Sequence, residues 1–305
     1  MRNYVLGLPL DNVSLDEAAA WVLEALERPP PEGQPGRLVV TLNPEIVVRT
    51  REDALLGEAV SRAELVVADG VGVVWAAKRQ GVALRGRVPG VDLVQRVLEL
   101  GGADVAVYML GGQPGVAEAA AREAEKRYGT RVAGHHHGYF ETPEETAQVV
   151  RAVRESGARL LLAGLGERQE KFLYQHAAAL GAAVMIGVGG TLDVLAGHVR
   201  RMPRWTTRLG VEWLFRVALD PRRWRRAPRL WRFTMLVLSR GARPRRGRCP
   251  PRPSPWPPRT AGVQPGSGRR SRRGTPRAGP APAAGPPPRC TRAKWRRCAA
   301  LSPPR

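Results

Sequence analysis

The chain has 305 residues and a formal net charge of +22 at pH 7, but the charge is unevenly distributed. Residues 1–199 hold 20 basic and 25 acidic residues, residues 200–240 hold 12 and 2, and residues 241–305 hold 17 and none. The basicity therefore belongs to the C-terminal third, and it does not identify the whole protein as one that binds nucleic acid.

We expect no targeting signal in the N-terminal region. Acidic residues follow the first apolar residues too soon for a signal peptide, and no run of about 20 apolar residues is present to span a bilayer. All three cysteines lie after residue 240, so neither a disulfide framework nor a thiolate metal site supports the earlier part of the chain. We therefore expect a cytoplasmic protein.

Short β-rich runs alternate with helical patterns over the first 190 residues. In chain order we predict a helix that begins with a capping box of Ser14 and Glu17, then a strand at 38–42, helix 44–60, strand 64–68, helices 72–80 and 90–100, strand 104–110, helix 114–128, a weak strand near 130–133, helix 143–156, strand 159–163, helix 169–180 and strand 183–188. This alternation is typical of βαβ units. It predicts an α/β fold for residues 1–199, a Rossmann-like, largely parallel sheet with helices on both faces.

Residues 200–240 interleave arginine with aromatic and aliphatic residues. Apolar positions share a helical face at Leu209, Trp213 and Val217, and residues 229–238 add further large apolar side chains. This composition suits a basic helical appendage on an anionic membrane surface. The same ingredients also suit RNA binding, or a helical cap packed on the core with solvated arginines.

Residues 241–305 contain 16 of the 28 prolines and almost no periodic apolar residues. They cannot bury enough surface to offset a backbone entropy cost of about 1–2 kcal/mol per residue. We predict a disordered tail. The alternatives are a tail without function, such as a translated shifted frame of GC-rich DNA, and a polybasic arm for anionic lipid or nucleic acid.

In α/β sheets of this kind the ligand lies outside the carboxyl ends of the strands. Polar residues follow two predicted strands, and glycine-rich turns follow the others, at Gly111, Gly112, Gly115, Gly164, Gly166, Gly187, Gly189 and Gly190. These turns predict a cleft in which main-chain amides approach phosphates, although an ordinary strand-to-helix connection explains each one equally well. None has the G-x-G-x-x-G pattern, which disfavours a nicotinamide enzyme.

Asp69 stands at the end of the buried run "LVVADG". A carboxylate in this place, next to a glycine that leaves room for substrate, is suited to take a proton from a hydroxyl. The alternative is an N-cap for the helix that starts near Val71, and both roles are compatible. The consecutive histidines His135, His136 and His137 do not predict a metal site, because neighbouring side chains on a strand point to opposite faces.

Six blocks of the sequence resemble, in order, those of the WecG/TagA/CpsF glycosyltransferases. They are "TLNPE" (41–45), "ADGVGVV" (68–74), "RVPGVDL" (87–93), "LLAGLGERQEKF" (161–172), "GVGGTLDVLAGHVRRMP" (187–203) and "RLGVEWLFRVALDPRRWRR" (208–226). The resemblance implies an inverting, metal-independent transfer without a cofactor. An N-acetylmannosamine-type sugar would pass from a UDP-sugar to undecaprenyl-diphosphate-linked N-acetylglucosamine. The setting would be the inner face of the bacterial membrane, in the assembly of teichoic acid or another surface polysaccharide.

The resemblance also implies roles for individual residues. Asp69 would be the general base, Thr41 and Asn43 would orient sugar or acceptor, and Arg87 would hold phosphate. The remaining predicted contacts are Asp92, which equally suits a structural helix acid, Gln169 and Glu170 near the nucleotide, the main chain at Gly111, Gly112, Gly189 and Gly190, and the guanidinium groups of Arg216, Arg222 and Arg223 against the departing UDP. Two local departures from the family pattern are "GLGERQE", which is one residue short and lacks a proline, and Ala68 where a proline is common.

The resemblance further implies self-association that competes with membrane docking, and no nucleic-acid partner. Two other functions are weighed against the transferase: a nucleotide-binding oxidoreductase on a similar sheet, and a nucleic-acid-binding module built from residues 200–305. Bound NAD(P) would support the first, and salt-sensitive binding that survives deletion of the core would support the second.

Overall fold

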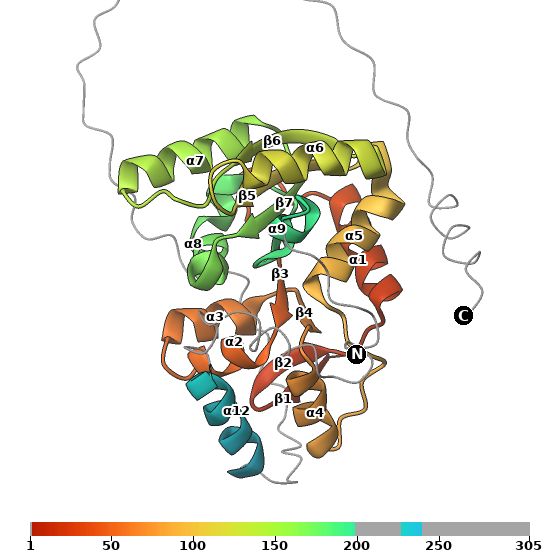
Figure 1. Cartoon of the computed structure of the whole chain (residues 1–305), viewed down its shortest axis with the longest axis vertical. Coiled ribbons are helices and arrows are strands. Elements are labelled where there is room, and N and C mark those ends of the chain that lie inside the picture. Colours follow the sequence, from red (N-terminus) through yellow and green to blue (C-terminus); the bar gives the residue numbers. More distant parts are fainter. Residues whose placement is uncertain (1, 199–226, 240–305) are drawn as a thin grey trace, which may run out of the picture. The chain divides into compact units, whose positions relative to one another are not determined.

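The computed structural model describes residues 2–198 and 227–239, which all belong to the first of two units of the chain, Met1–Pro250. Its centre is a six-stranded sheet with the order β4-β3-β8-β7-β5-β6, and every neighbouring pair is parallel (Figure 1). The strands are β3 (Arg37–Leu42), β4 (Leu65–Ala68), β5 (Ala106–Gly111), β6 (Arg131–His136), β7 (Leu160–Gly164) and β8 (Val184–Gly187). The predicted α/β fold with a parallel sheet is confirmed.

Two groups of helices cover the sheet (Figure 1). On one side α1 (Leu15–Glu27), α5 (Gly90–Gly101), α6 (Val116–Tyr128) and α9 (Thr191–Leu195) pack together, and on the other side α3 (Ala54–Arg62), α7 (Pro143–Glu155) and α8 (Gln169–Leu180) do. Five of these strands are almost entirely buried on both faces, as expected for a sheet enclosed by helices, whereas the edge strand β6 is half-buried to exposed. The capping box of α1 is present, since the Ser14 hydroxyl accepts from the Glu17 amide and the Glu17 carboxylate accepts from the Ser14 amide.

One predicted helix is wrong in extent. The pattern over 44–60 forms two helices, α2 (Pro44–Arg49) and α3, with a break between them. Asp53 starts the second helix because its carboxylate accepts from the Leu56 amide at 3.0 Å. The helix predicted from residue 114 begins at Val116, because Gly115 before it has a left-handed backbone with φ of 88°.

The sequence analysis missed an N-terminal hairpin. Strands β1 (Arg2–Val5) and β2 (Leu8–Asp11) pair in antiparallel fashion around Leu6 and Gly7, both with positive φ. The hairpin lies beside β4, where the Asp11 carboxylate accepts from the Val66 amide at 2.9 Å. Each strand has only four residues, too few for an alternating pattern to be distinctive.

The part of the predicted appendage that the structure describes is a helix, α12 (Ala227–Ser239). It packs on α2, with Phe233 and Val237 buried. A Cβ at Gly72 of α4 (Val71–Arg79) would lie 3.2 Å from the Phe233 ring, so α12 also lies against the start of α4. The predicted boundaries near 199 and 240, the tail, and Arg216, Arg222 and Arg223 fall outside the described residues.

Candidate active site

Asp69 follows β4 directly and points to the start of a neighbouring helix. Its Oδ1 accepts a hydrogen bond from the Gly90 amide, the first residue of α5, at 3.1 Å. The amide of Val88 donates to the Ala68 carbonyl at 2.7 Å, so the segment before α5 runs along the end of β4. The alternative that Asp69 caps α4 is wrong, because Gly70 is the N-cap and no side chain completes that cap. The carboxylate is instead held at the positive end of α5.

Thr41 lies against Gly90, the residue whose amide binds Asp69. Thr41 is on β3, is only 5% exposed, and its hydroxyl donates to the Gly187 carbonyl of β8 at 3.1 Å. A Cβ at Gly90 would lie 3.2 Å from Thr41 Cγ2 and 3.4 Å from its Oγ1. A side chain at residue 90 would therefore crowd Thr41, and the glycine lets the start of α5 lie close to it.

Asn43 has a defined structural task. It is the N-cap of α2, and its Oδ1 accepts from the Ile46 amide at 3.0 Å. A substrate contact by this side chain would therefore come from Nδ2. Its Cβ lies 3.9 Å from the position that a Cβ on Gly70 would take, so Asn43 borders the turn that carries Asp69.

Arg87 and Asp92 lie on either side of Gly90. Arg87 is half-buried in the segment that runs along the end of β4, which places it near the Asp69 turn. Asp92 is in the first turn of α5, where a carboxylate complements the helix dipole. This position supports the structural alternative for Asp92.

Gln169 and Glu170 begin α8 and are almost fully buried, at 6% and 2% exposure. Gln169 Oε1 accepts from the Gly189 amide at 3.0 Å, and its Nε2 donates to Glu170 Oε1 at 2.7 Å. A Cβ at Gly187 would lie 3.0 Å from Gln169 Nε2. Since Thr41 binds the carbonyl of this same Gly187, the β8 turn joins Thr41 to Gln169.

Burial raises the pKa of the Glu170 carboxyl, and the hydrogen bond from Gln169 opposes that rise. The second carboxyl oxygen, Oε2, is buried without a hydrogen-bond partner among the described residues. Burial to this degree leaves little surface for the direct substrate contact predicted for Glu170.

Two of the main-chain amides predicted to bind phosphate are already hydrogen-bonded within the protein. The Gly112 amide donates to the Gly164 carbonyl at 3.2 Å, and the Gly189 amide is bound by Gln169. These glycines serve another purpose, which is to let neighbouring turns touch. A Cβ at Gly111 would lie 2.4 Å from the Gly164 carbonyl oxygen, and one at Gly164 would lie 2.6 Å from that of Gly189. Gly190 is the N-cap of α9.

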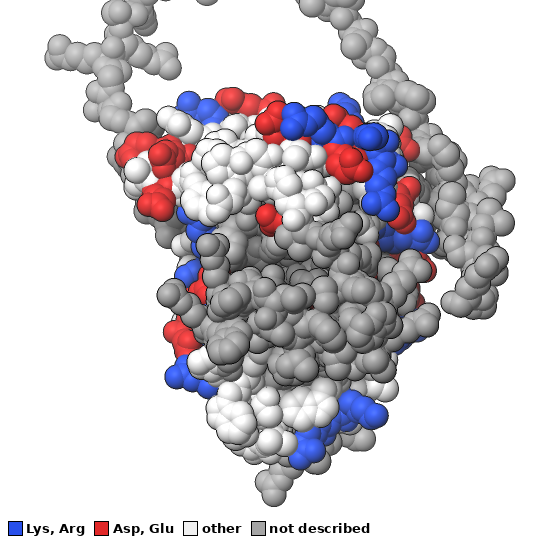
Figure 2. Space-filling view, viewed as in Figure 1, with Lys and Arg blue, Asp and Glu red and all other residues white. Residues whose placement is uncertain are grey.

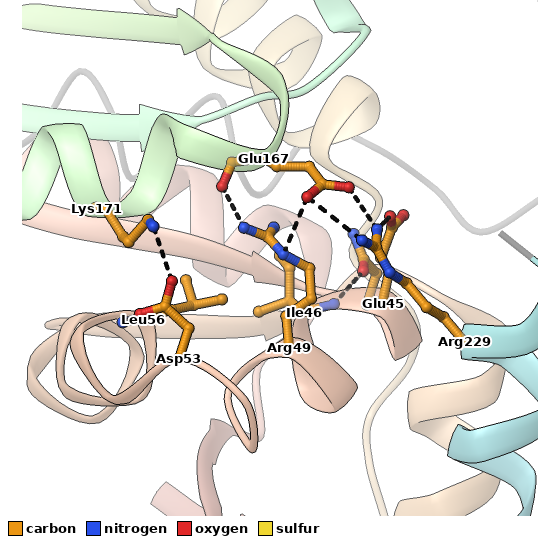
Figure 3. Close-up of polar contacts among 9 residues, drawn as sticks. Glu45, Ile46, Arg49, Asp53, Leu56, Glu167, Lys171 and Arg229 are labelled. Carbon is orange, nitrogen blue, oxygen red and sulfur yellow. Dashed lines mark hydrogen bonds and ion pairs between the residues drawn. The ribbon is translucent and has the colours of Figure 1, made fainter. Parts of the chain in front are cut away.

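A charged pocket that the sequence did not indicate lies where the end of α2, the start of α8 and the start of α12 come together (Figure 3). It has a volume of about 280 Å³ and is lined only by charged residues, which are Arg49, Glu52, Asp53, Glu167, Arg168, Lys171 and Arg229. Arg229 of α12 binds both Glu45 of α2, at 2.6 Å, and Glu167 of the short 3-10 helix η2 (Gly166–Arg168). The pocket combines segments far apart in the sequence, so no local pattern marks it. It does not include Asp69.

The histidine run ends β6, and its rings make contacts within the loop. His136 Nδ1 lies 2.8 Å from the His137 carbonyl, and the His136 ring packs edge-on to Phe140. Arg168 stacks over the Phe140 ring at 4.2 Å and donates to the Gly138 carbonyl at 2.6 Å. Among residues 2–198 and 227–239 no three histidine, cysteine or acidic side chains are arranged to hold a metal ion.

Comparison with known proteins assigns the family. The model of the Glycosyl transferase WecG/TagA/CpsF family matches residues 3–247. The N-acetylglucosaminyldiphosphoundecaprenol N-acetyl-beta-D-mannosaminyltransferase of Staphylococcus aureus strain NCTC 8325 / PS 47 is 36% identical over 229 residues, which are 74% of this chain and 87% of that protein. The proteins of the same name from strains COL and MRSA252 match with the same identity and coverage. This similarity favours the transferase over the oxidoreductase and the nucleic-acid-binding module, and the chain belongs to the WecG/TagA/CpsF family of glycosyltransferases.

Proposed function

We propose that this enzyme transfers N-acetylmannosamine from a UDP-sugar to undecaprenyl-diphosphate-linked N-acetylglucosamine, with inversion and without a metal ion. The observation that carries the proposal is the Asp69 carboxylate, held by the Gly90 amide beside Thr41 at the carboxyl end of the sheet. The names of the staphylococcal relatives supply the sugar and the acceptor.

In the proposed mechanism Asp69 acts as the general base. It removes the proton from an acceptor hydroxyl while that oxygen attacks the anomeric carbon of the donor. The new glycosidic bond forms as the bond to UDP breaks, and UDP leaves with the bonding electron pair. The Gly90 hydrogen bond fixes the orientation of the carboxylate, and an ionised carboxylate has lone pairs for more than one donor.

Cationic side chains would stabilise the departing diphosphate in place of a metal ion. Arg87, in the segment that runs along the end of β4 beside the Asp69 turn, is the candidate among the described residues. Arg216, Arg222 and Arg223 remain candidates from outside the described residues. Guanidinium groups suit the task because they bind phosphate oxygens through paired, charge-assisted hydrogen bonds.

The acceptor implies work at a membrane, and α12 has a surface suited to it. The described helices include none that is long and apolar enough to cross a bilayer. On α12, however, Trp231, Met235 and Leu238 are 65%, 39% and 44% exposed, and their spacing places them on one helical face. In Figure 2 uncharged side chains cover this end of the molecule, with basic side chains at the border. We propose that this face enters the interface of the inner leaflet.

A transfer assay tests the chemistry. The donor is UDP-N-acetylmannosamine, the acceptor is a short-chain polyprenyl-diphosphate N-acetylglucosamine, and EDTA is present. We expect product from the wild type and a loss of about 10²–10⁴-fold in kcat for Asp69→Asn, because one proton transfer loses its base. The matched control is Asp104→Asn, an exposed acid of the 3-10 helix before β5, which should keep full activity.

Two results would contradict the proposal. Turnover by Asp69→Asn close to that of the wild type excludes Asp69 as the base. Product only from another UDP-sugar refutes N-acetylmannosamine as the donor sugar while leaving the site in place.

Vesicle binding tests the membrane face. The full chain is sedimented with phosphatidylglycerol vesicles at about 1 M salt, where a screening length of about 3 Å suppresses the purely electrostatic attraction of the basic segments. We expect Trp231→Ser with Met235→Ser to weaken binding, whereas Tyr139→Ser, an exposed aromatic on a different loop, should not. Equal binding by all three proteins would exclude the α12 face.

A further inference from the structure

We propose that Glu170 is a positioning residue whose task is to set the side-chain amide of Gln169, and through it the turn after β8. The inference rests on the proposed function, because it concerns the same site. It replaces a direct contact of Glu170 with substrate by an indirect role.

The side-chain amide of Gln169 has one fixed orientation. A glutamine amide has a donor end and an acceptor end, and Gln169 uses both within the protein. Its Oε1 accepts from the Gly189 amide at 3.0 Å, and its Nε2 donates to Glu170 Oε1 at 2.7 Å. A flipped amide would set two N–H donors against each other at Gly189. Glu170 therefore stabilises the one orientation that the Gly189 amide also requires.

The Gln169 amide is connected to Asp69, the proposed base, through the end of β8. A Cβ added to Gly187 would lie 3.0 Å from Gln169 Nε2, so the Gln169 amide packs against the last residue of β8. The carbonyl of that residue accepts from Thr41 at 3.1 Å, and Thr41 contacts Gly90, which holds Asp69. The position of the Gln169 amide is thus connected to Asp69 through two glycines and a buried threonine.

Glu170 is buried, and one of its two carboxyl oxygens is not hydrogen-bonded among the described residues. The side chain is 2% exposed, and its Oε2 has no hydrogen-bond partner within the described part of the chain. A buried polar atom left in this state costs free energy, so stability alone does not account for a carboxyl here. The contact that the carboxyl does make is with Gln169, which is the contact that the proposal requires.

A double-mutant cycle in kcat/KM tests the proposal. Glu170→Leu removes the acceptor for Gln169 Nε2 and should lower kcat/KM about tenfold, whereas Glu170→Gln keeps a carbonyl oxygen there and should stay within about threefold of the wild type. In the Gln169→Ala background, Glu170→Leu should change kcat/KM by less than about twofold, because no amide remains to be positioned.

The control is Glu64, a half-buried carboxyl whose pKa is also raised by burial, located at the opposite end of the sheet. Its Oε2 accepts from the Leu38 amide at 2.8 Å, near the start of β3. Glu64→Leu should lower thermal stability and leave kcat/KM of the folded enzyme unchanged. An equal kinetic loss from Glu170→Leu in both backgrounds, or from Glu170→Gln and Glu170→Leu alike, would overturn the positioning role. Unchanged kinetics in Glu170→Leu would do the same.

Amide hydrogen exchange gives a readout that does not depend on the reaction. The Gly189 amide should exchange faster in Glu170→Leu than in Glu170→Gln or the wild type, because its acceptor on Gln169 is no longer held. Unchanged exchange overturns the proposal even if the wild type shows no turnover with the chosen donor. Faster exchange together with an inactive wild type would uphold the positioning of Gln169 and refute the proposed reaction.

Discussion

The carboxyl edge of the sheet has two halves that are built differently. At the ends of β4, β3 and β8, side chains make the contacts, with Thr41 and Asp69 meeting at Gly90 and Gln169 holding the β8 turn. At the ends of β7 and β5, main chain packs on main chain, with Gly111 and Gly164 in direct contact. The first half thus has groups suited to chemistry, and the second holds the turns close together. A change in the first half should lower activity and cost some stability, whereas a change in the second should act mainly on stability.

The largest expected effect is on stability, from Gly164→Ala. The new Cβ would lie 2.6 Å from the Gly189 carbonyl oxygen, and neither main-chain segment can move without disturbing the sheet. We expect a loss of about 3 kcal/mol or more in the free energy of unfolding, the upper range for overpacking. Urea unfolding measures it.

The corresponding substitution in the half formed by the ends of β4, β3 and β8 is Gly187→Ala. Its Cβ would lie 3.0 Å from Gln169 Nε2 and 3.3 Å from its Cδ, so the Gln169 side chain would have to shift against its hydrogen bonds to Gly189 and Glu170. We expect a stability loss of about 1 kcal/mol and a clear fall in kcat/KM, because Gln169 must move. Gly86→Ala is the control, since a Cβ there meets nothing within 4 Å. Equal losses of stability at 164 and 187 would contradict the division into two halves.

The next prediction concerns the hydrogen bond that joins β3 to β8. Thr41→Val removes the hydroxyl that donates to the Gly187 carbonyl, so a buried hydrogen bond between β3 and β8 is lost. The expected cost is about 0.5–1.5 kcal/mol in the free energy of unfolding, together with a loss of transfer activity. Thr41→Ser keeps the hydroxyl and should retain most of both. If the valine variant is as active as the serine variant, the Thr41 hydroxyl has only a structural role.

These positions also show how far the sequence leads. Strands β3, β4, β5, β7 and β8 were predictable because uninterrupted apolar runs mark strands buried on both faces, and residues at strand ends predicted Thr41 and Asp69 at one edge. The four-residue strands β1 and β2 have no such run. The sequence did not show that Gly112 and Gly189 use their amides within the protein, because a glycine-rich turn looks the same whether its donors face a ligand or another turn. Nor did it show the pocket around Arg49 and Arg229, since local periodicity does not specify which distant segments meet.

A smaller effect should appear in the pH dependence of stability. Burial raises the folded-state pKa of Glu170 above its ordinary value, while Gln169 and the charge of Arg49 oppose the rise and Glu45 adds to it. The folded protein therefore holds this proton to higher pH than the unfolded chain does. Its contribution to stability is present below the ordinary glutamate pKa of about 4.3 and declines as the pH rises from there through the folded pKa.

Glu170→Gln removes this proton and should flatten the decline, as measured by urea unfolding at a series of pH values. Glu64→Gln is the informative comparison, because burial raises the pKa of Glu64 too, at the other end of the sheet. Each variant should flatten the decline separately, and the double variant should combine the two changes. A decline that is unchanged in Glu170→Gln would mean that Glu170 does not carry the extra proton.

The smallest expected effect comes from the ion pairs of α12, and it bears on how the two halves are connected. Arg229 reaches Glu45, after β3, and Glu167, after β7, so one guanidinium spans both halves. Among the described residues Arg232 pairs with Glu52 alone, and both of these side chains are more than half exposed. We expect Arg229→Ala to cost about 1 kcal/mol and Arg232→Ala less than about 0.5 kcal/mol in thermal unfolding, both differences shrinking at high salt. If the two variants prove equal, the ion pairs of Arg229 do not hold the halves together. The buried Phe233 and Val237 would then account for the attachment of α12, and the halves would be joined by the pairing of β8 with β7 and by Gln169 against the β8 turn.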